Sequence, residues 1–218
     1  MNTAMKKKVL AALVCSMALI GPMSAQGLSS AESAIGENGF SLGYVLGYAG
    51  EFFVGDMNDF LPQAHGFWAG GTAGYKGLTA TLEASVGFGT LEVPFVHNGP
   101  WIMGDKVTAG QVGLTLDYAL YNGTYLRLAP LAGVAACSLV NTEVEETSVN
   151  ALRLMVGGQL DWKIFRAASE QIELFGLLPM RVKMDSGLRL RVFMARNFYE
   201  NPCAANSLNV SLGWYQKL

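Results

Sequence analysis

The chain has 218 residues, of which 51% are hydrophobic, only 15% are charged and 26 are glycine. Typical soluble domains carry about 25% charged residues, so this composition is poor in charge for a domain surrounded by water. The formal net charge of −2 provides no basic surface, and we expect no nucleic-acid partner.

The first predicted element is a secretory signal peptide over residues 1–25. Lys6, Lys7 and Lys8 precede a short apolar run that ends near Gly21, and small residues lead up to Ala25. The apolar run is shorter than the roughly 20 residues that a membrane-spanning helix needs. We therefore expect cleavage after Ala25 and Sec-type export, with residues 26–39 as a short N-terminal segment.

From residue 40 onward, eight segments alternate apolar and polar residues, which is the pattern of a β-strand with one apolar face. The clearest is LTATLEASVGF at 78–88. The predicted strands are 40–49, 65–75, 78–88, 108–121, 125–137, 150–164, 171–184 and 208–215. Segment 188–196, LRLRVFMAR, also alternates, and we expect it to extend a strand or form a small hairpin in the last loop, unless the barrel has ten strands.

The predicted connections alternate between short and long. The short ones are 76–77, 122–124 and 165–170, and the long ones are 50–64, 89–107, 138–149 and 185–207. Short periplasmic turns and long extracellular loops are typical of outer-membrane barrels. We predict an all-β fold: an eight-stranded antiparallel up-and-down transmembrane β-barrel over 40–218. Pro130 and Pro179 fall inside predicted strands, and we expect a local bulge at each because proline cannot donate a ladder hydrogen bond.

Aromatic residues of the apolar face gather near the strand ends, as they do at the two boundaries of a lipid bilayer. This predicted girdle consists of Tyr75, Tyr118, Trp162 and Trp214 near one end and Tyr48, Phe67 and Phe88 near the other. The alternative is a soluble barrel, in which the apolar face would point inward and line a ligand cavity.

The opposite face of the strands carries a nearly balanced set of charges. They are Glu83, Asp117, Arg127, Arg153, Asp161, Lys163, Glu173, Arg181 and Lys183. In a membrane barrel these groups share the interior, or lumen, where buried charges must be paired and hydrogen-bonded. We therefore expect a lumen filled by ion-paired side chains.

The plan of strands and turns over 40–215 resembles the small outer-membrane β-barrels of the OmpA/OmpX type, or a barrel family of similar length. The resemblance lies in LTATLEASVGF-like strands, tight turns such as YKG and YNGT, and long loops. It departs at the C-terminus, where such barrels usually end with an aromatic residue and this chain ends GWYQKL. The resemblance implies location in a Gram-negative outer membrane, with membrane lipid as the partner.

We find no motif for a metal, a cofactor or a catalytic site, and we expect no enzyme. His65 and Ser85, a possible base and nucleophile for lipid A modification, lie on opposite strand faces. Cys137 and Cys203 are expected on the outer side, either as a disulfide or as two unpaired cysteines.

The predicted loop 89–107 displays large apolar residues. They either pack on the barrel rim or form a contact surface, since large exposed apolar patches usually indicate binding. Phe95, Trp101, Ile102 and Met103 form this possible contact surface for an extracellular ligand or protein. The sequence therefore favours a structural or surface-interaction barrel. The alternatives are a narrow channel, a transporter of a small hydrophobic ligand, and a lipid-A-modifying enzyme.

Overall fold

The computed structural model describes residues 40–96, 100–144, 147–166, 170–174, 178–182, 184–199 and 204–217. The predicted signal peptide and the segment 26–39 lie outside the described residues. None of the helices in the described ranges is long and apolar enough to cross a membrane.

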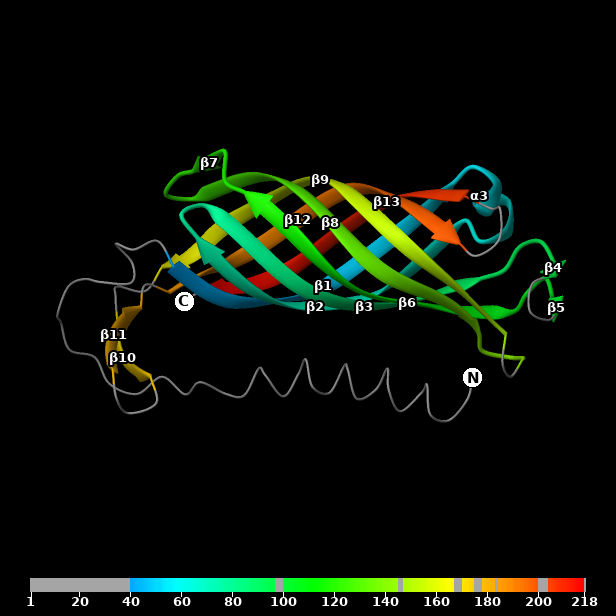
Figure 1. Cartoon of the computed structure of the whole chain (residues 1–218), viewed down its shortest axis with the longest axis horizontal. Helices are drawn as coiled ribbons and strands as arrows, with labels where there is room; N and C mark the ends of the chain where they lie inside the picture. Colours follow the sequence, from blue (N-terminus) through cyan, green and yellow to red (C-terminus); the bar gives the residue numbers. More distant parts are fainter. Residues whose placement is uncertain are drawn as a thin grey trace.

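Eight antiparallel strands close into a barrel, as the sequence predicts (Figure 1). They are β1 (Phe40–Val54), β2 (Gln63–Tyr75), β3 (Leu78–Thr90), β6 (Lys106–Tyr118), β8 (Leu126–Asn141), β9 (Ser148–Arg166), β12 (Asp185–Tyr199) and β13 (Ala204–Lys217). Each strand pairs with its neighbours in this order, and the pairing of β1 with β13 joins the two ends of the chain of strands. Closure leaves no free edge along the barrel wall.

The described parts of the connections add five short strands and one helix. They are α3 (Asp56–Phe60), the pair β4 (Phe95–Val96) and β5 (Pro100–Trp101), β7 (Tyr121–Asn122), and the pair β10 (Glu170–Leu174) and β11 (Leu178–Val182). In Figure 1, α3 and β4–β5 lie at one end of the barrel, which we call the loop end. The C-terminus and β7 lie at the other end, which we call the termini end.

The strands are strongly tilted against the barrel axis. A path across paired residues that leaves Leu42 on β1 crosses the seven other strands and returns to β1 at Phe52. This displacement along β1 is the stagger that a closed barrel requires, and it corresponds to a tilt of about 35–45°.

The seventh barrel strand is not the predicted one. It is β12, which contains the alternating segment 188–196, whereas the predicted strand 171–184 forms the separate pair β10–β11. The barrel accordingly has eight strands and not ten. Both segments alternate, and Pro179 lies in β11, away from the closed wall where its missing N–H would interrupt a ladder.

Because β12 takes the place of the predicted strand 171–184, the last two connections differ in length from the predicted ones. At the loop end the last connection shrinks to residues 200–203, while at the termini end the connection from β9 to β12 spans 167–184. The predicted contrast between short and long connections therefore holds for the first half of the chain only.

Pro130, where the sequence predicts a bulge, itself continues β8 without a register shift against β9, and the irregularity lies in the segment that faces it on the other side. The ladder between β6 and β8 stops at the pair Asp117–Leu131 and resumes in β7 at Tyr121–Leu128, so one strand has an extra residue here. This irregularity lies opposite Pro130, which pairs with β9 on its other side.

Candidate functional site

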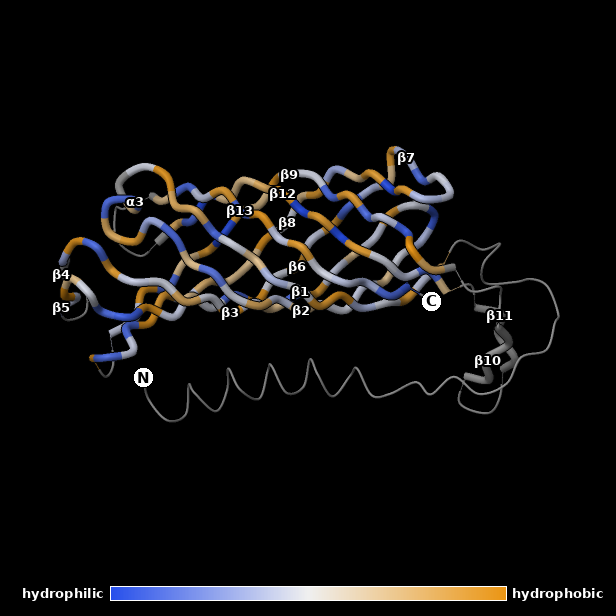
Figure 2. The backbone as a smooth tube through the Cα atoms, turned by 180° about the vertical axis from the view of Figure 1, so that it is seen from behind, coloured by the Kyte–Doolittle hydropathy of each residue, from blue (hydrophilic) through white to orange (hydrophobic). Residues whose placement is uncertain are grey.

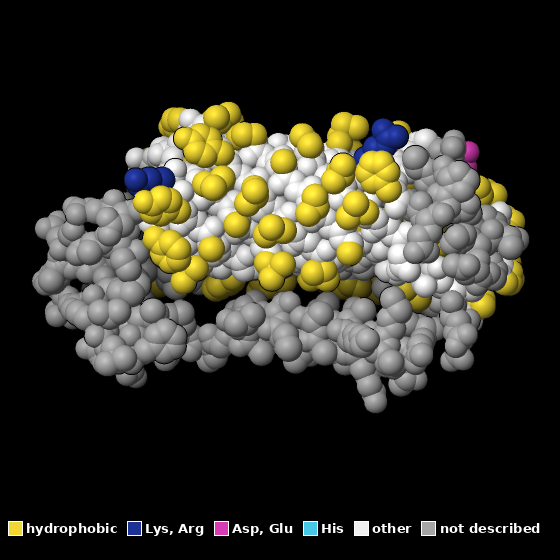
Figure 3. Space-filling view, in the orientation of Figure 1, with side chains coloured by type: hydrophobic (Ala, Val, Ile, Leu, Met, Phe, Trp, Pro, Cys, Tyr) yellow, Lys and Arg dark blue, Asp and Glu magenta, His cyan; other side chains and the backbone are white. Residues whose placement is uncertain are grey.

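The outer surface of the barrel wall is apolar over its whole middle. Figure 2 shows hydrophobic and hydrophilic residues alternating along the strands. Many of the large hydrophobic side chains of the strands are exposed on the outside of the barrel. Leu82 and Val156, both at mid-strand, are 62% and 67% exposed. In the face shown in Figure 3, hydrophobic side chains are spread along the whole wall, and basic side chains are visible only near its two ends. A wall of this kind avoids water and matches a hydrocarbon solvent.

Every residue of the predicted girdle lies on this outer surface. Tyr48, Phe67, Tyr75, Phe88, Tyr118, Trp162 and Trp214 are all exposed. Tyr48 and Phe67 are paired neighbours whose rings pack edge to face, with 5.6 Å between the ring centres. At the termini end the structure adds Tyr121, Tyr125 and Phe165, which are also exposed. Tyr121 ends the predicted strand 108–121 and Tyr125 begins the predicted strand 125–137, and the alternation of each strand assigns its tyrosine to the polar face. The structure turns both outward around β7, where the ladder is irregular.

The lumen is filled by buried charges that pair in three groups. The group nearest the termini end is centred on Asp161, which accepts hydrogen bonds from Arg189 Nε and NH2 at 2.7 and 2.9 Å. Arg127 joins Asp161 to Asp117 and also donates to Thr79 Oγ1 at 3.1 Å. Each of these four charges is hydrogen-bonded, as burial requires.

The middle group is the ion pair of Arg191 and Glu83. The Arg191 guanidinium also lies 5.0 Å from the ring centre of Trp68 and 5.4 Å from that of Phe193. Two aromatic faces therefore hold this cation in place beside its carboxylate.

The third group, toward the loop end, is the ion pair of Arg153 and Glu51. Arg153 donates from Nε to Asn197 Oδ1 and from NH1 to Gln111 Oε1, both at 2.6 Å. These bonds link β1, β6, β9 and β12 across the lumen.

An apolar cluster closes the lumen at the loop end. This apolar plug consists of Phe53, Met57, Leu61, Ala64, Leu91, Trp101, Val107, Leu139, Val149 and Ala205. Met57 comes from α3 and Trp101 from β5, so the connections fold inward over the barrel mouth. Of the two alternatives for Trp101, packing at the barrel rim or an exposed contact surface, the structure shows the first, because its side chain is only 1% exposed within the plug.

The neighbouring residues do remain at the surface. Ile102 and Met103 are 56% and 67% exposed. Their turn is fixed by Asp105, whose Oδ2 accepts bonds from the Ile102 N–H at 2.8 Å and from Asn141 Nδ2 at 2.5 Å. The Phe95 side chain lies outside the described residues.

Of the nine predicted lumen charges, the structure brings six into the interior. Lys163, the sixth, contacts Asp185 at 3.9 Å and donates to Asn122 Oδ1 at 2.6 Å and Gly123 O at 3.0 Å. The other three, Glu173, Arg181 and Lys183, belong to the segment of β10–β11, and their side chains lie outside the described residues.

Four charges of these interior ion pairs were not predicted from the sequence: Glu51, Asp185, Arg189 and Arg191. Each lies in a segment assigned to a loop, since β1 runs five residues beyond its predicted end and β12 was taken as part of the last connection. The alternation of LRLRVFMAR was the signal that could have found the two arginines.

The predicted separation of His65 and Ser85 is observed. Ser85 lines the lumen, whereas His65 lies on the outer face with its ring 6.4 Å from that of Phe52. The two cannot act as base and nucleophile, because a base must reach its nucleophile within hydrogen-bond distance. Within the described ranges, no three His, Cys, Asp or Glu residues cluster as a metal site would require.

The alternative of a Cys137–Cys203 disulfide is not formed. Cys137 is a free, buried cysteine, and its thiol faces Gln111 Oε1 at 4.0 Å. The strand continues beyond Cys137 to Asn141, so the thiol points into the lumen and not toward the rim. Cys203 lies outside the described residues.

The distribution of polarity is inverted relative to a soluble protein, with paired charges inside and large apolar side chains outside over the full circumference. A soluble barrel would bury the apolar face. The chain is a membrane-spanning β-barrel. Its eight tilted strands, apolar belt and aromatic ends are the architecture of the small outer-membrane barrels of the OmpA/OmpX type.

Comparisons with known proteins give only distant similarities. No protein-family model matches the sequence, and no curated protein matches it. Among solved structures, Neisserial surface protein A aligns with a TM-score of 0.46 at 11% identity, covering 83% of this chain and 96% of that one. Ail, the attachment invasion locus protein of Yersinia pestis, in complex with the heparin analogue sucrose octasulfate, aligns with a TM-score of 0.46 at 10% identity. The alignment covers 82% of this chain and 99% of that one.

The N-terminal β-barrel domain of Pseudomonas aeruginosa OprF aligns with a TM-score of 0.42 at 10% identity, covering 80% of this chain and 96% of that one. At such values these similarities decide nothing about function, which must be inferred from the residues of the barrel itself.

Proposed function

We propose that this outer-membrane barrel is a closed protein with a structural or surface-interaction role, exported by a signal peptide over residues 1–25 and oriented with its loop end outside the cell. The observation that carries the proposal is the filled lumen. Three ion-paired groups and the apolar plug follow one another along the interior.

A conducting path would have to break several of these contacts together. Removing one partner from a buried ion pair costs about 3–5 kcal/mol, so a state with all three groups open is rarely populated. The apolar plug adds a region that excludes water without any charge to attract it. The lumen therefore supports the barrel wall from within and leaves the loop end as the part available to partners.

Planar-bilayer recording tests the closed lumen. The mature chain is folded in detergent, checked for a heat-dependent shift in gel mobility, and added to a bilayer in potassium chloride. We expect no current steps above those of the detergent alone. Regular steps whose frequency rises with the amount of folded protein would reject the closed barrel in favour of the channel.

The loop end offers one specific contact surface, the exposed turn of Ile102 and Met103. Trp101 anchors it from one side, and Asp105 fixes its backbone. A rigid apolar turn loses little conformational entropy when it binds, which favours contact with an apolar partner surface.

The surface role is tested on whole cells that display the protein. The double variant Ile102→Ser, Met103→Ser is compared with wild type for partition of the cells into hexadecane, at equal amounts of folded protein. We expect fewer variant cells in the hexadecane phase. Equal partition would remove this turn as a contact surface and leave the structural role.

A further inference from the structure

One arginine of the wall faces outward, beside the apolar belt. Arg196 lies on β12, three residues before the strand ends at Tyr199, and its side chain is exposed. Its neighbours in the chain, Ala195 and Asn197, are both buried inside the barrel. Arg196 therefore occupies a lipid-facing position, where a cation is strongly destabilising at mid-membrane and tolerated near the two interfaces.

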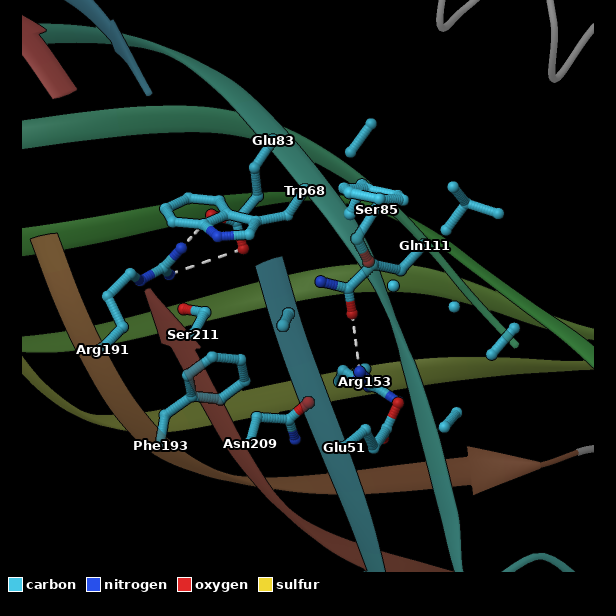
Figure 4. A pocket seen from close by; sticks show the side chains of 18 residues that line it. Glu51, Trp68, Glu83, Ser85, Gln111, Arg153, Arg191, Phe193, Asn209 and Ser211 are labelled. Carbon is cyan, nitrogen blue, oxygen red and sulfur yellow. Dashed lines mark hydrogen bonds and ion pairs between the residues drawn. The ribbon is translucent and has the colours of Figure 1, made fainter. Parts of the chain in front are cut away.

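The other wall arginines with described side chains point inward. Figure 4 shows two of them, Arg153 and Arg191, directed into the lumen toward Gln111 and Glu83. Each inward arginine has an acidic partner, whereas Arg196 has no carboxylate within ion-pair distance among the residues that the structure describes. The charge of Arg196 is thus left to be balanced from outside the described chain.

The surroundings of Arg196 mark the edge of the apolar belt. Toward the middle of the wall, the next outward residue on its own strand is the exposed Met194, and its register partner on β9 is the exposed Leu154. Its register partner on β13 is the exposed, polar Asn206. A long basic side chain at such a boundary reaches the layer in which lipid headgroups meet the hydrocarbon.

Phe198 orients the guanidinium at this level. Its ring centre lies 5.5 Å from the guanidinium carbon of Arg196, and its side chain is exposed on the same face of β12. The amide of Asn206 is close, because directly opposed residues of antiparallel strands have Cβ atoms about 4.5–5.5 Å apart. A guanidinium held against an aromatic ring keeps its N–H groups available to an acceptor.

These groups have the chemistry of a phosphate site. A guanidinium donates two parallel N–H bonds to a phosphate, and an asparagine amide can add a further donor. Of the charged wall side chains that the structure describes, only Arg196 and Lys106 are exposed, and both are cations at the loop end. An anion that approaches the outer face here therefore meets positive charge and no exposed wall acid.

We propose that Arg196, with Phe198 and Asn206, binds the phosphate of a lipid headgroup in the leaflet at the loop end. The guanidinium donates to the phosphate, Phe198 orients it, and the apolar belt at Met194 and Leu154 receives the acyl chains. This leaflet is the outer one, an assignment that rests on the orientation given in the proposed function. The lipid is then lipid A, whose sugars carry the phosphates.

Native mass spectrometry of the folded mature chain in a neutral detergent tests the site. The probes are diphosphorylated lipid A and the same lipid with its phosphates removed. We expect saturable retention of the diphosphorylated form and at least about tenfold weaker retention of the other, because a charge-assisted contact is lost. Equal retention of the two lipids would overturn the proposal.

A pair of variants at opposite ends of the barrel supplies the control. Arg196→Gln is expected to weaken retention of lipid A about tenfold. Lys76→Gln removes an exposed cation that lies 5.2 Å from the ring centre of Tyr75 in the turn at the termini end, and it should leave retention unchanged. If both variants lose retention equally, attraction by net charge replaces the site.

Arg196→Lys serves if Arg196→Gln does not fold, as judged by the heat-dependent shift in gel mobility. It keeps the charge but loses the planar fork of donors, so retention should fall about threefold or more. A folded Arg196 variant that retains lipid A as wild type does contradicts the proposal.

Inorganic phosphate distinguishes a lipid site from a site for the free ion. We expect a large excess of it to leave the retained lipid A in place, and displacement would overturn the lipid assignment. The closed lumen is measured separately, by bilayer recording. Current steps with intact lipid A retention would reject the closed barrel alone, and loss of retention without current steps would reject this site alone.

Discussion

The acid at the centre of the first interior group, Asp161, should be among the most sensitive residues of the barrel. In Asp161→Ala, Arg189 loses the carboxylate that it contacts through two nitrogen atoms, and Arg127 keeps Asp117. Arg189 is only 3% exposed, so its charge cannot turn outward to water.

The size of the effect follows from this burial. Removing one partner of a buried ion pair costs about 3–5 kcal/mol, because the remaining charge is left without compensation. Replacing both partners by apolar side chains of similar volume is often close to neutral. We therefore expect Asp161→Ala to lower the free energy of unfolding by about 3–5 kcal/mol, and Asp161→Leu combined with Arg189→Met to recover at least about 2 kcal/mol of it.

Urea unfolding in phospholipid vesicles measures both values, with tryptophan fluorescence and gel mobility as independent probes. The slope of free energy against urea must stay constant for the comparison to report stability. Glu143→Ala, an exposed acid at the loop end, is the control and should lie within about 0.5 kcal/mol of wild type.

Two results would refute this reasoning. If Asp161→Ala is as stable as the Glu143→Ala control, the lumen is hydrated enough to solvate Arg189. If the double variant is no more stable than the single one, the loss comes from packing and not from an unpaired charge.

Three further predictions follow from other parts of the barrel. Val156→Arg, at mid-strand on the outer surface, should cost about 2–4 kcal/mol in vesicle unfolding, and a cost near zero would mean that this face does not meet lipid. Trp101→Ala should cost about 3–5 kcal/mol by emptying part of the apolar plug and should expose residues 91–105 to protease, whereas Met103→Ala should do neither. Lys163→Met should speed amide hydrogen exchange in the β7 hairpin, which Lys163 holds through Asn122 and Gly123, and unchanged exchange there would show that the ladder alone fixes it.

Much of the fold could be predicted because alternation is a local property of the chain. A segment such as LTATLEASVGF must place one set of side chains on each face of any sheet that it joins. Odd and even positions of a strand lie on opposite faces, so the alternation placed Glu83, Asp117 and Asp161 inside the barrel and the girdle residues outside.

The seventh strand could not be chosen on the same ground. Segments 171–184 and 188–196 both alternate, and only pairing with β9 and β13 decides which one joins the wall. Pro179 could not decide the choice, because Pro130 lies within the wall strand β8, where the ladder on one side is interrupted. Choosing the wrong segment hid Arg189 and Arg191, and with them the true partners of Asp161 and Glu83.

The sequence by itself thus determined an antiparallel barrel with a lipid-facing apolar surface. The alternation of apolar and polar residues and the positions of the aromatic residues are both local properties that can be read directly from the sequence. Only the tertiary structure decided which charges meet, that Trp101 turns into the barrel mouth, and that Arg196 faces outward from the wall. These features depend on register around a closed circuit, and register joins residues that are far apart in the chain.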